Sequence, residues 1–178
     1  FLLRAYLHFM LVNIWAEPYG TTKSATAPGI PYLTRPEKNA LVDYERGTVK
    51  EVYEKIEKDL KLGLSLVNDD YYVKPKFHFN KKAAYAFASR FYLIKGKWDL
   101  VVSYSDYVLG VDPKPVLRNW QKYKKEFNSN HKYLYIRYAS VDEPANLLLT
   151  TTESRVARNI PSEKYGVTIQ SAEKVYNE

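Results

Sequence analysis

The sequence predicts a mostly α-helical fold, built from tetratricopeptide-like helical hairpins with long irregular loops. Three observations lead to this prediction. Apolar residues recur at helical spacing in four segments before residue 110, one glycine turn joins the last two segments, and proline and glycine interrupt the chain between residues 16 and 47. With 178 residues, of which 46% are hydrophobic, the chain has enough material for one domain with a buried core.

The first expected helix covers residues 1–15 and is apolar on nearly every side. We expect it to pack on two sides, with His8 as a hydrogen-bonded core residue and not a ligand. It is too short for the roughly 20 residues of a bilayer span, and it lacks the basic start and cleavage site of a signal peptide. Because no capping residue precedes it, we expect the chain to be a piece of a longer protein.

The second expected helix starts at Thr48 after a proline-rich loop over residues 16–47. Thr48 and Glu51 form the capping-box pattern, in which both side chains satisfy free backbone N–H groups. One face then carries Val49, Val52, Tyr53, Ile56, Leu60, Leu64 and Val67. This spacing predicts an amphipathic helix with a solvated opposite face.

The third and fourth expected helices, over residues 81–95 and 98–109, form a hairpin. Asn80 can cap the first of them, and Gly96 provides the turn. Tyr85, Ser89, Tyr92, Gly96, Trp98, Leu109 and Pro113 follow the order of a tetratricopeptide unit, with Val101, Ser105 and Val108 as departures. We expect the first two helices to form a similar pair, so that residues 1–115 make one scaffold with residues 16–47 inserted.

Regular patterns weaken after residue 115. Val116, Trp120, Tyr123 and Phe127 mark one stripe of a short, lysine-rich helix. Residues 131–139 alternate as in a strand, and residues 146–152 fit either a strand or a buried turn of helix. We therefore expect residues 116–178 to be a loop-rich, truncated continuation of the same domain, with short β segments near its end.

Catalytic and metal-binding patterns are absent from the sequence. The chain has no Cys, its three His residues lack metal-ligand spacing, and no phosphate-binding or nucleophile motif occurs. The adjacent pair Asp69 and Asp70 cannot converge across a glycosidic bond as hydrolysis requires. The net charge is +7, but the lysines are scattered among aromatics. We expect no enzyme activity, no cofactor, no metal and no nucleic-acid partner.

Tyrosine is unusually frequent, with 17 residues, and its ring can stack on a sugar while its hydroxyl forms hydrogen bonds. Those in the helices (Tyr6, Tyr53, Tyr85, Tyr92 and Tyr104) are expected to pack in the core. Several others are equally compatible with packing or ligand contact: Trp15, Tyr19, Tyr32, Tyr71 and Tyr72. Our candidate glycan-binding residues are Trp120, Tyr123, Tyr133 and Tyr135.

Several segments together resemble the SusD/RagB family of Bacteroidetes outer-membrane lipoproteins. They are LRAYLHFMLVNIWAEPYG, GIPYLTRPE, RGTVKEVYEKIEKDL, HFNKKAAYAFASRFYLIKGKWDLVVSYSDYVLG and EPANLLL, in family order. The resemblance implies a surface-exposed outer-membrane protein on a tetratricopeptide-like scaffold. Such a protein binds oligosaccharide without cleaving it and delivers it to a SusC-like TonB-dependent transporter.

The chain departs from the family in two respects. The lipid-bearing cysteine and the signal peptide are not in this sequence, so contact with the membrane would occur only through a lipid anchor outside the chain. The family's glycan site varies among members, and no binding residue carries over from it. The alternative hypothesis is a helical-repeat adaptor that binds another protein and no glycan.

Overall fold

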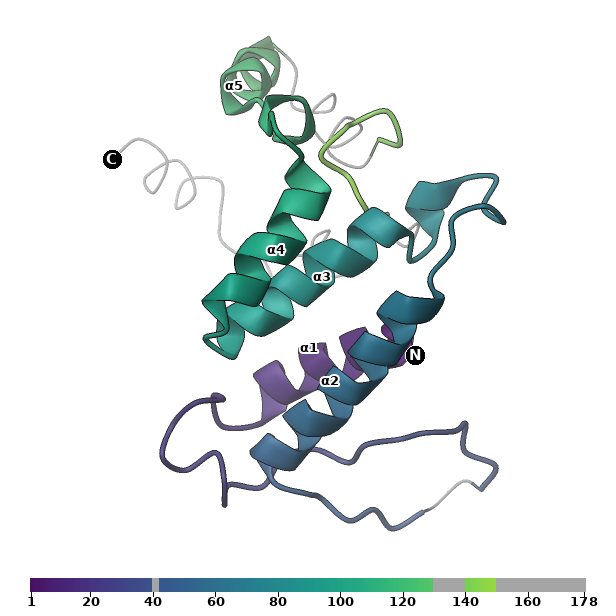
Figure 1. Ribbon diagram of the computed structural model, residues 1–178, viewed down its shortest axis with the longest axis vertical. Helices are drawn as coiled ribbons and strands as arrows, with labels where there is room; N and C mark the ends of the chain where they lie inside the picture. The colour runs from purple at the N-terminus through teal and green to yellow at the C-terminus, as the bar shows by residue number, and fades with distance from the viewer. Residues whose placement is uncertain (40–41, 130–139, 150–178) are drawn as a thin grey trace, which may run out of the picture. The chain divides into compact units, whose positions relative to one another are not determined.

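The computed structural model describes residues 1–39, 42–129 and 140–149 (Figure 1). Within these residues it is mostly α-helical and has no β-sheet. The elements in order are α1 (Leu2–Trp15), α2 (Val49–Leu66), the 3-10 turn η1 (Pro75–Phe77), α3 (Lys81–Ile94), α4 (Trp98–Leu109), the 3-10 turn η2 (Lys114–Val116) and α5 (Trp120–Ser129). Chain contacts divide the protein into residues 1–148 and 149–178, and all these elements belong to the first unit.

The helices begin and end close to the predicted residues, because local signals mark their ends. Thr48 and Glu51 form the expected capping box, and the Asn80 side chain accepts a hydrogen bond from the backbone N–H of Ala83 at 2.9 Å. The last helix starts at Trp120, since the Asn119 side chain before it accepts a hydrogen bond from the Lys122 N–H. The expected strand over residues 131–139 lies outside the described residues. Residues 146–149 form neither helix nor strand.

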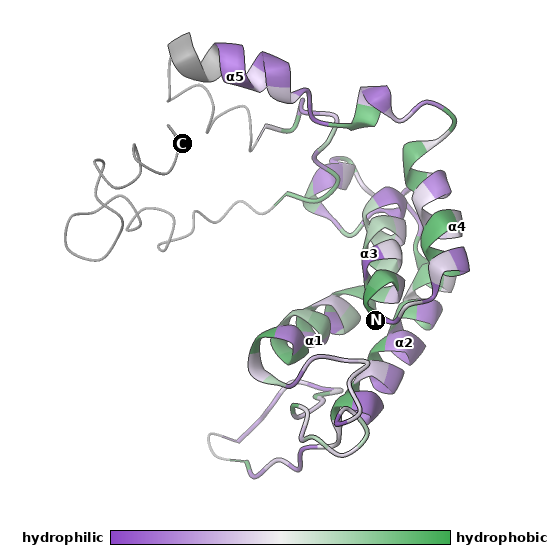
Figure 2. Cartoon of the chain, turned by 90° about the vertical axis from the view of Figure 1, so that its left-hand side faces the viewer, coloured by the Kyte–Doolittle hydropathy of each residue, from purple (hydrophilic) through white to green (hydrophobic). Residues whose placement is uncertain are grey.

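The helices pack as two pairs, α1 with α2 and α3 with α4 (Figure 1). The Phe9 ring of α1 joins the pairs, because its centre lies 6.3 Å from that of Tyr53, 5.4 Å from Phe87 and 5.9 Å from Phe91. As predicted, α1 packs on two neighbours, but its other face is exposed and carries Leu3, Leu7, Leu11, Ile14 and Trp15. In Figure 2, hydrophilic residues cover one side of α2 and most of α5.

The α3–α4 hairpin is consistent with a tetratricopeptide-like unit, and small side chains meet where its helices cross. The hydroxyl oxygens of Ser89 and Ser105 are 2.8 Å apart where the helices cross. The rings of Tyr92 and Tyr104 stack with their centres 5.6 Å apart. Gly96 forms the turn with a φ of 67°, which favours glycine. The predicted scaffold boundary near residue 115 stays a prediction.

The loop between α1 and α2 is a packed surface loop and is attached to both helices. The middle of the loop pairs with its end through the Gly29 N–H, which donates to the Gly47 carbonyl at 2.7 Å. Further along, Ile30 is buried in the core, and the Tyr32 hydroxyl donates to Asp59 of α2 at 2.6 Å. The insertion therefore contributes to the core although it has no regular structure.

Gly63 allows α1 to approach α2 closely. A Cβ atom at this position would lie 2.6 Å from the Leu2 Cγ, which is closer than real Cβ atoms come to other heavy atoms. It would also lie 3.0 Å from the Leu2 backbone nitrogen, which is an unusually tight contact. Close packing of α1 on α2 therefore requires glycine at position 63.

We predict that Gly63→Ala lowers the free energy of unfolding by up to about 2 kcal/mol. Overpacking costs about 1–3 kcal/mol and outweighs the roughly 1 kcal/mol that alanine gains in a helix. Chemical denaturation of the single variant and of Leu2→Ala with Gly63→Ala measures the effect, and the cost should shrink in the Leu2→Ala background. A stabilised single variant would contradict the close crossing.

Glu57 of α2 joins the two helix pairs. Its carboxylate accepts a hydrogen bond from the Tyr92 hydroxyl at 3.1 Å, forms an ion pair with Lys95 next to α3, and lies 2.8 Å from Lys61. Burial alone would raise the pKa of Glu57, but the two lysines outweigh it and lower the pKa to about 2.

We predict that Glu57 makes stability depend on pH in the acid range. Its folded pKa of about 2 lies below the ordinary value, so the stabilisation is complete at neutral pH and is lost as pH falls from about 4 to 2. Glu57→Gln should cost about 1–2 kcal/mol at pH 7 and flatten this decline, as measured by denaturation at several pH values. Glu54→Gln, an exposed change on the same helix, is the matched control. Equal pH profiles in both variants would contradict the role of Glu57.

Candidate functional site

Trp120, a predicted glycan-binding residue, is the first residue of α5 and is 66% exposed. Asn119 fixes the start of this helix, because its side-chain oxygen accepts from the Lys122 N–H and its carbonyl accepts from the Tyr123 N–H, both at 3.0 Å. An indole in this position presents a flat apolar surface to solvent. Such a surface can stack on the apolar face of a sugar ring.

Tyr123, also a predicted binding residue, is buried, with 4% of its surface exposed. Its hydroxyl donates to Glu143 Oε2 at 2.6 Å and accepts from Arg118 Nη1 at 3.0 Å. Burial and the bond to Glu143 raise the pKa of Tyr123. The ring centre lies 5.8 Å from that of Trp120, so Tyr123 supports the exposed indole and offers little of its own surface to a ligand.

Tyr133 and Tyr135, the other two predicted binding residues, lie outside the described residues. The structure therefore places Trp120 and Tyr123 close together and leaves the other two as predictions. The spacing of Trp120 and Tyr123 in the sequence predicts a shared helix face, but it does not tell which of the two rings is covered.

The side chains that cover Tyr123 form a polar cluster of Arg118, Tyr123, Glu143 and Asn146. Glu143 is 7% exposed and Asn146 is 6% exposed. Arg118 donates to the Asn146 side chain, whose amide donates to the Ser140 carbonyl at 2.8 Å. Sequence reasoning missed Arg118, Glu143 and Asn146 because they follow no periodic pattern. The turn-forming Pro144 and the family-like segment EPANLLL indicate an ordered segment here, but not which of its residues bind Tyr123 and Arg118.

Asn80 fixes the chain around this polar cluster to the start of α3. While its Oδ1 caps the helix, its Nδ2 donates to the Leu147 carbonyl at 2.7 Å. Lys76 in η1 also donates to the Glu143 carbonyl at 2.8 Å. Trp120 is therefore displayed on a short helix whose support extends to the helical scaffold.

The remaining aromatic candidates divide into packed and exposed residues. Tyr19 packs on Tyr53 with ring centres 4.3 Å apart, and Tyr32 stacks on His8 at 4.0 Å. In contrast, Trp15 is 71% exposed and Tyr71 is 85% exposed. Tyr72 stacks on His78 at 4.5 Å. Tyr19 and Tyr32 are therefore explained by packing against the helices and not by ligand contact.

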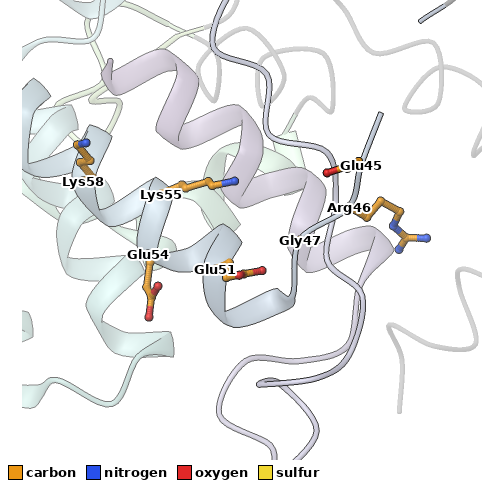
Figure 3. Close-up of a pocket in the computed structure, with 7 residues that line it drawn as sticks. All are labelled: Glu45, Arg46, Gly47, Glu51, Glu54, Lys55 and Lys58. Carbon is orange, nitrogen blue, oxygen red and sulfur yellow. The ribbon is translucent and has the colours of Figure 1, made fainter. Parts of the chain in front are cut away.

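A charged hollow of about 480 Å³ opens between the loop end and α2 (Figure 3). It is lined by Glu45, Arg46, Gly47, Glu51, Glu54, Lys55 and Lys58. Three acidic and three basic side chains balance one another, and Glu51 is engaged by the Thr48 N–H at 2.7 Å. This hollow can hydrogen-bond hydroxyl groups, but it has no aromatic lining on which a sugar could stack.

A smaller apolar hollow of about 270 Å³ lies along the α3–α4 hairpin. Its walls include Ala86, Val108, Leu117 and Leu147, with Ser89 and Ser105 as polar lining groups. Among the described residues, no group of three or more His, Asp or Glu side chains is placed to hold a metal ion. The described helices include none that is both long enough and apolar enough to cross a membrane.

Comparisons with known proteins point to one family. The family model of SusD-like proteins, described as starch-binding and associating with the outer membrane, matches residues 1–93. A search of curated proteins found no match. The match covers α1 to most of α3 and stops before Trp120.

Two solved structures from Bacteroides species are similar to this chain. A SusD superfamily protein of Bacteroides thetaiotaomicron VPI-5482 is 25% identical with a TM-score of 0.56, over 68% of this chain and 26% of that one. A SusD-like carbohydrate-binding protein of Bacteroides vulgatus ATCC 8482 is 24% identical with a TM-score of 0.59, over 80% of this chain and 27% of that one. The matched region thus spans about a quarter of each of these structures.

We predict that the two neighbouring aromatic residues contribute unequally to stability. Trp120→Ala should change the free energy of unfolding by less than about 0.5 kcal/mol, because the indole is exposed. Tyr123→Phe should cost about 1–3 kcal/mol, because the buried Glu143 carboxylate loses the hydrogen bond from the Tyr123 hydroxyl. Denaturation curves measure both values. Similar losses in the two variants would contradict the division into an exposed indole and a buried support.

Proposed function

This chain belongs to the SusD-like family of starch-binding proteins that associate with the outer membrane, and on that premise we propose that it binds oligosaccharide without cleaving it. The family match covers the scaffold, while the proposed contact residues lie further along the chain. Binding by stacking and hydrogen bonds fits the surface described above.

The exposed indole of Trp120 is the observation that carries the proposal. Its helix is fixed by the polar cluster, so little conformational entropy is lost when a sugar stacks on it. Lys124 follows at the i+4 position of α5 and is exposed. A side chain at this spacing lies on the same helix face and can donate hydrogen bonds to sugar hydroxyls.

The polar cluster supports binding and not hydrolysis. Cleavage of a glycosidic bond requires two carboxyl groups that converge on the bond from suitable distances. Glu143 is the carboxylate of this cluster, and it is buried and accepts the Tyr123 hydroxyl at 2.6 Å. We assign it a structural role beneath the binding surface.

We further propose that the protein lies on the cell surface and delivers its ligand to a SusC-like TonB-dependent transporter. The outer face of α4 is the proposed docking surface, since Trp98 and Val102 are more than half exposed there, at 64% and 59%. A lipid anchor outside this chain would hold the protein at the membrane. The same exposed apolar residues favour the second candidate function, a helical-repeat adaptor that binds protein alone.

We predict that Trp120→Ala weakens binding of the full-length protein to malto-oligosaccharide by roughly three- to tenfold, the value of one aromatic stacking contact. Isothermal titration against a panel of oligosaccharides measures the affinity. Trp98→Ala removes an equally exposed tryptophan from α4 and is the matched control: it should leave sugar affinity unchanged.

Transporter binding provides the second part of the test. Trp98→Ala should reduce co-purification with the transporter, whereas Trp120→Ala should not. If no glycan of the panel binds while the transporter still co-purifies, the adaptor hypothesis replaces glycan capture. If Trp120→Ala binds sugar as tightly as the native protein, the proposed contact surface is wrong.

A further inference from the structure

His8 in α1 is buried, with 8% of its surface exposed, and both of its ring nitrogens are hydrogen-bonded to backbone groups. Nδ1 lies 2.8 Å from the Arg4 carbonyl oxygen, and Nε2 lies 2.9 Å from the Leu33 nitrogen. A carbonyl only accepts and a backbone N–H only donates. The imidazole must therefore carry its proton on Nδ1 and keep Nε2 as an acceptor, which is the neutral form.

His8 belongs to a group of side chains that holds residues 32–34 of the loop to the helices. We call Arg4, His8, Tyr32 and Asp59 the loop clamp. The Tyr32 ring stacks on the imidazole at 4.0 Å, and its hydroxyl donates to Asp59 Oδ2 at 2.6 Å. Arg4 binds Asp59 through two nitrogens, at 2.5 and 2.6 Å, and donates to the Thr34 carbonyl at 2.9 Å.

The charges around His8 disfavour a second positive charge. Arg4 lies one turn away on the same helix, and Lys55 of α2 lies 6.0 Å from the centre of the Tyr32 ring. Asp59 of α2 is the nearby anion, and Arg4 and Tyr32 already occupy its oxygens. The Asp59 carboxylate is therefore already bonded and does not offset a positive charge on His8.

We propose that protonation of His8 breaks the hydrogen bond from the Leu33 N–H, so that residues 32–34 of the loop lose one of their attachments to α1 as the pH falls. A protonated Nε2 would point its hydrogen at the Leu33 N–H, and two donors cannot bond to each other. The attached loop is consequently favoured while His8 is neutral and weakened when His8 is protonated.

We expect α1 and α2 to stay paired when the hydrogen bond between Leu33 and His8 breaks. Burial alone would raise the pKa of Asp59, but the hydrogen bonds from Arg4 and Tyr32 outweigh it and hold the pKa below its ordinary value. The carboxylate thus stays ionised when His8 takes up its proton. Arg4 and Asp59 then continue to join α1 with α2, and only the attachment through His8 is lost.

Amide hydrogen exchange of the full chain tests this proposal. Protection of Leu33, corrected for the intrinsic pH dependence of exchange, should fall at least tenfold between pH 7.5 and 5, while amides in the middle of α2 should keep theirs. His8→Gln, whose side-chain oxygen can still accept a hydrogen bond, should remove the pH dependence. His78→Gln is the matched control, because His78 is exposed and stacks on Tyr72.

A second measurement needs no variant. Nitrogen NMR of the imidazoles in the native protein should show His8 protonated on Nδ1 alone at pH 7.5, and this signal should change together with the Leu33 amide as pH falls. Leu33 protection that does not change with pH, a pH dependence that persists in His8→Gln, or a proton on Nε2 at pH 7.5 would each overturn the proposal.

Discussion

The bidentate ion pair between Arg4 and Asp59 is the interaction on which the rest of the structure depends. It crosses between two helices that are separated by a long loop, and the same Arg4 side chain also binds that loop at Thr34. Because the Asp59 side chain is almost fully buried, its charge requires a partner, and loss of one partner of such a pair costs about 3–5 kcal/mol. The α3–α4 hairpin is then attached to this unit through Phe9 and Glu57.

The sequence predicted the helices well because their signals are local. Capping residues and apolar spacing lie within a few residues of one another, so Thr48 and Asn80 mark helix starts directly. The bonds that hold the loop are not local: Arg4 and Asp59 are far apart in the chain, and no spacing pattern distinguishes either of them from the other polar residues of its helix. Their pairing depends on how α1 crosses α2, which no local pattern encodes.

The candidate site was predicted only in part, for the same physical reason. Trp120 and Tyr123 are both aromatic and share one stripe of α5, yet one is exposed and the other is buried. The difference comes from a later segment without regular structure, in which Glu143 binds Tyr123 and Asn146 binds Arg118. Composition could indicate that tyrosine matters in this protein, but only the tertiary contacts separate supporting rings from accessible ones.

The unequal lengths of the two helix connections have a consequence for the order of folding. Residues 95–97 join α3 to α4, whereas residues 16–48 join α1 to α2. Closing a connection about ten times longer costs about 2 kcal/mol more in chain entropy. The short hairpin should therefore form early, and the rate-limiting barrier should contain the search that brings Arg4 to Asp59. The Arg4–Asp59 ion pair would then both stabilise the folded state and limit the rate of folding.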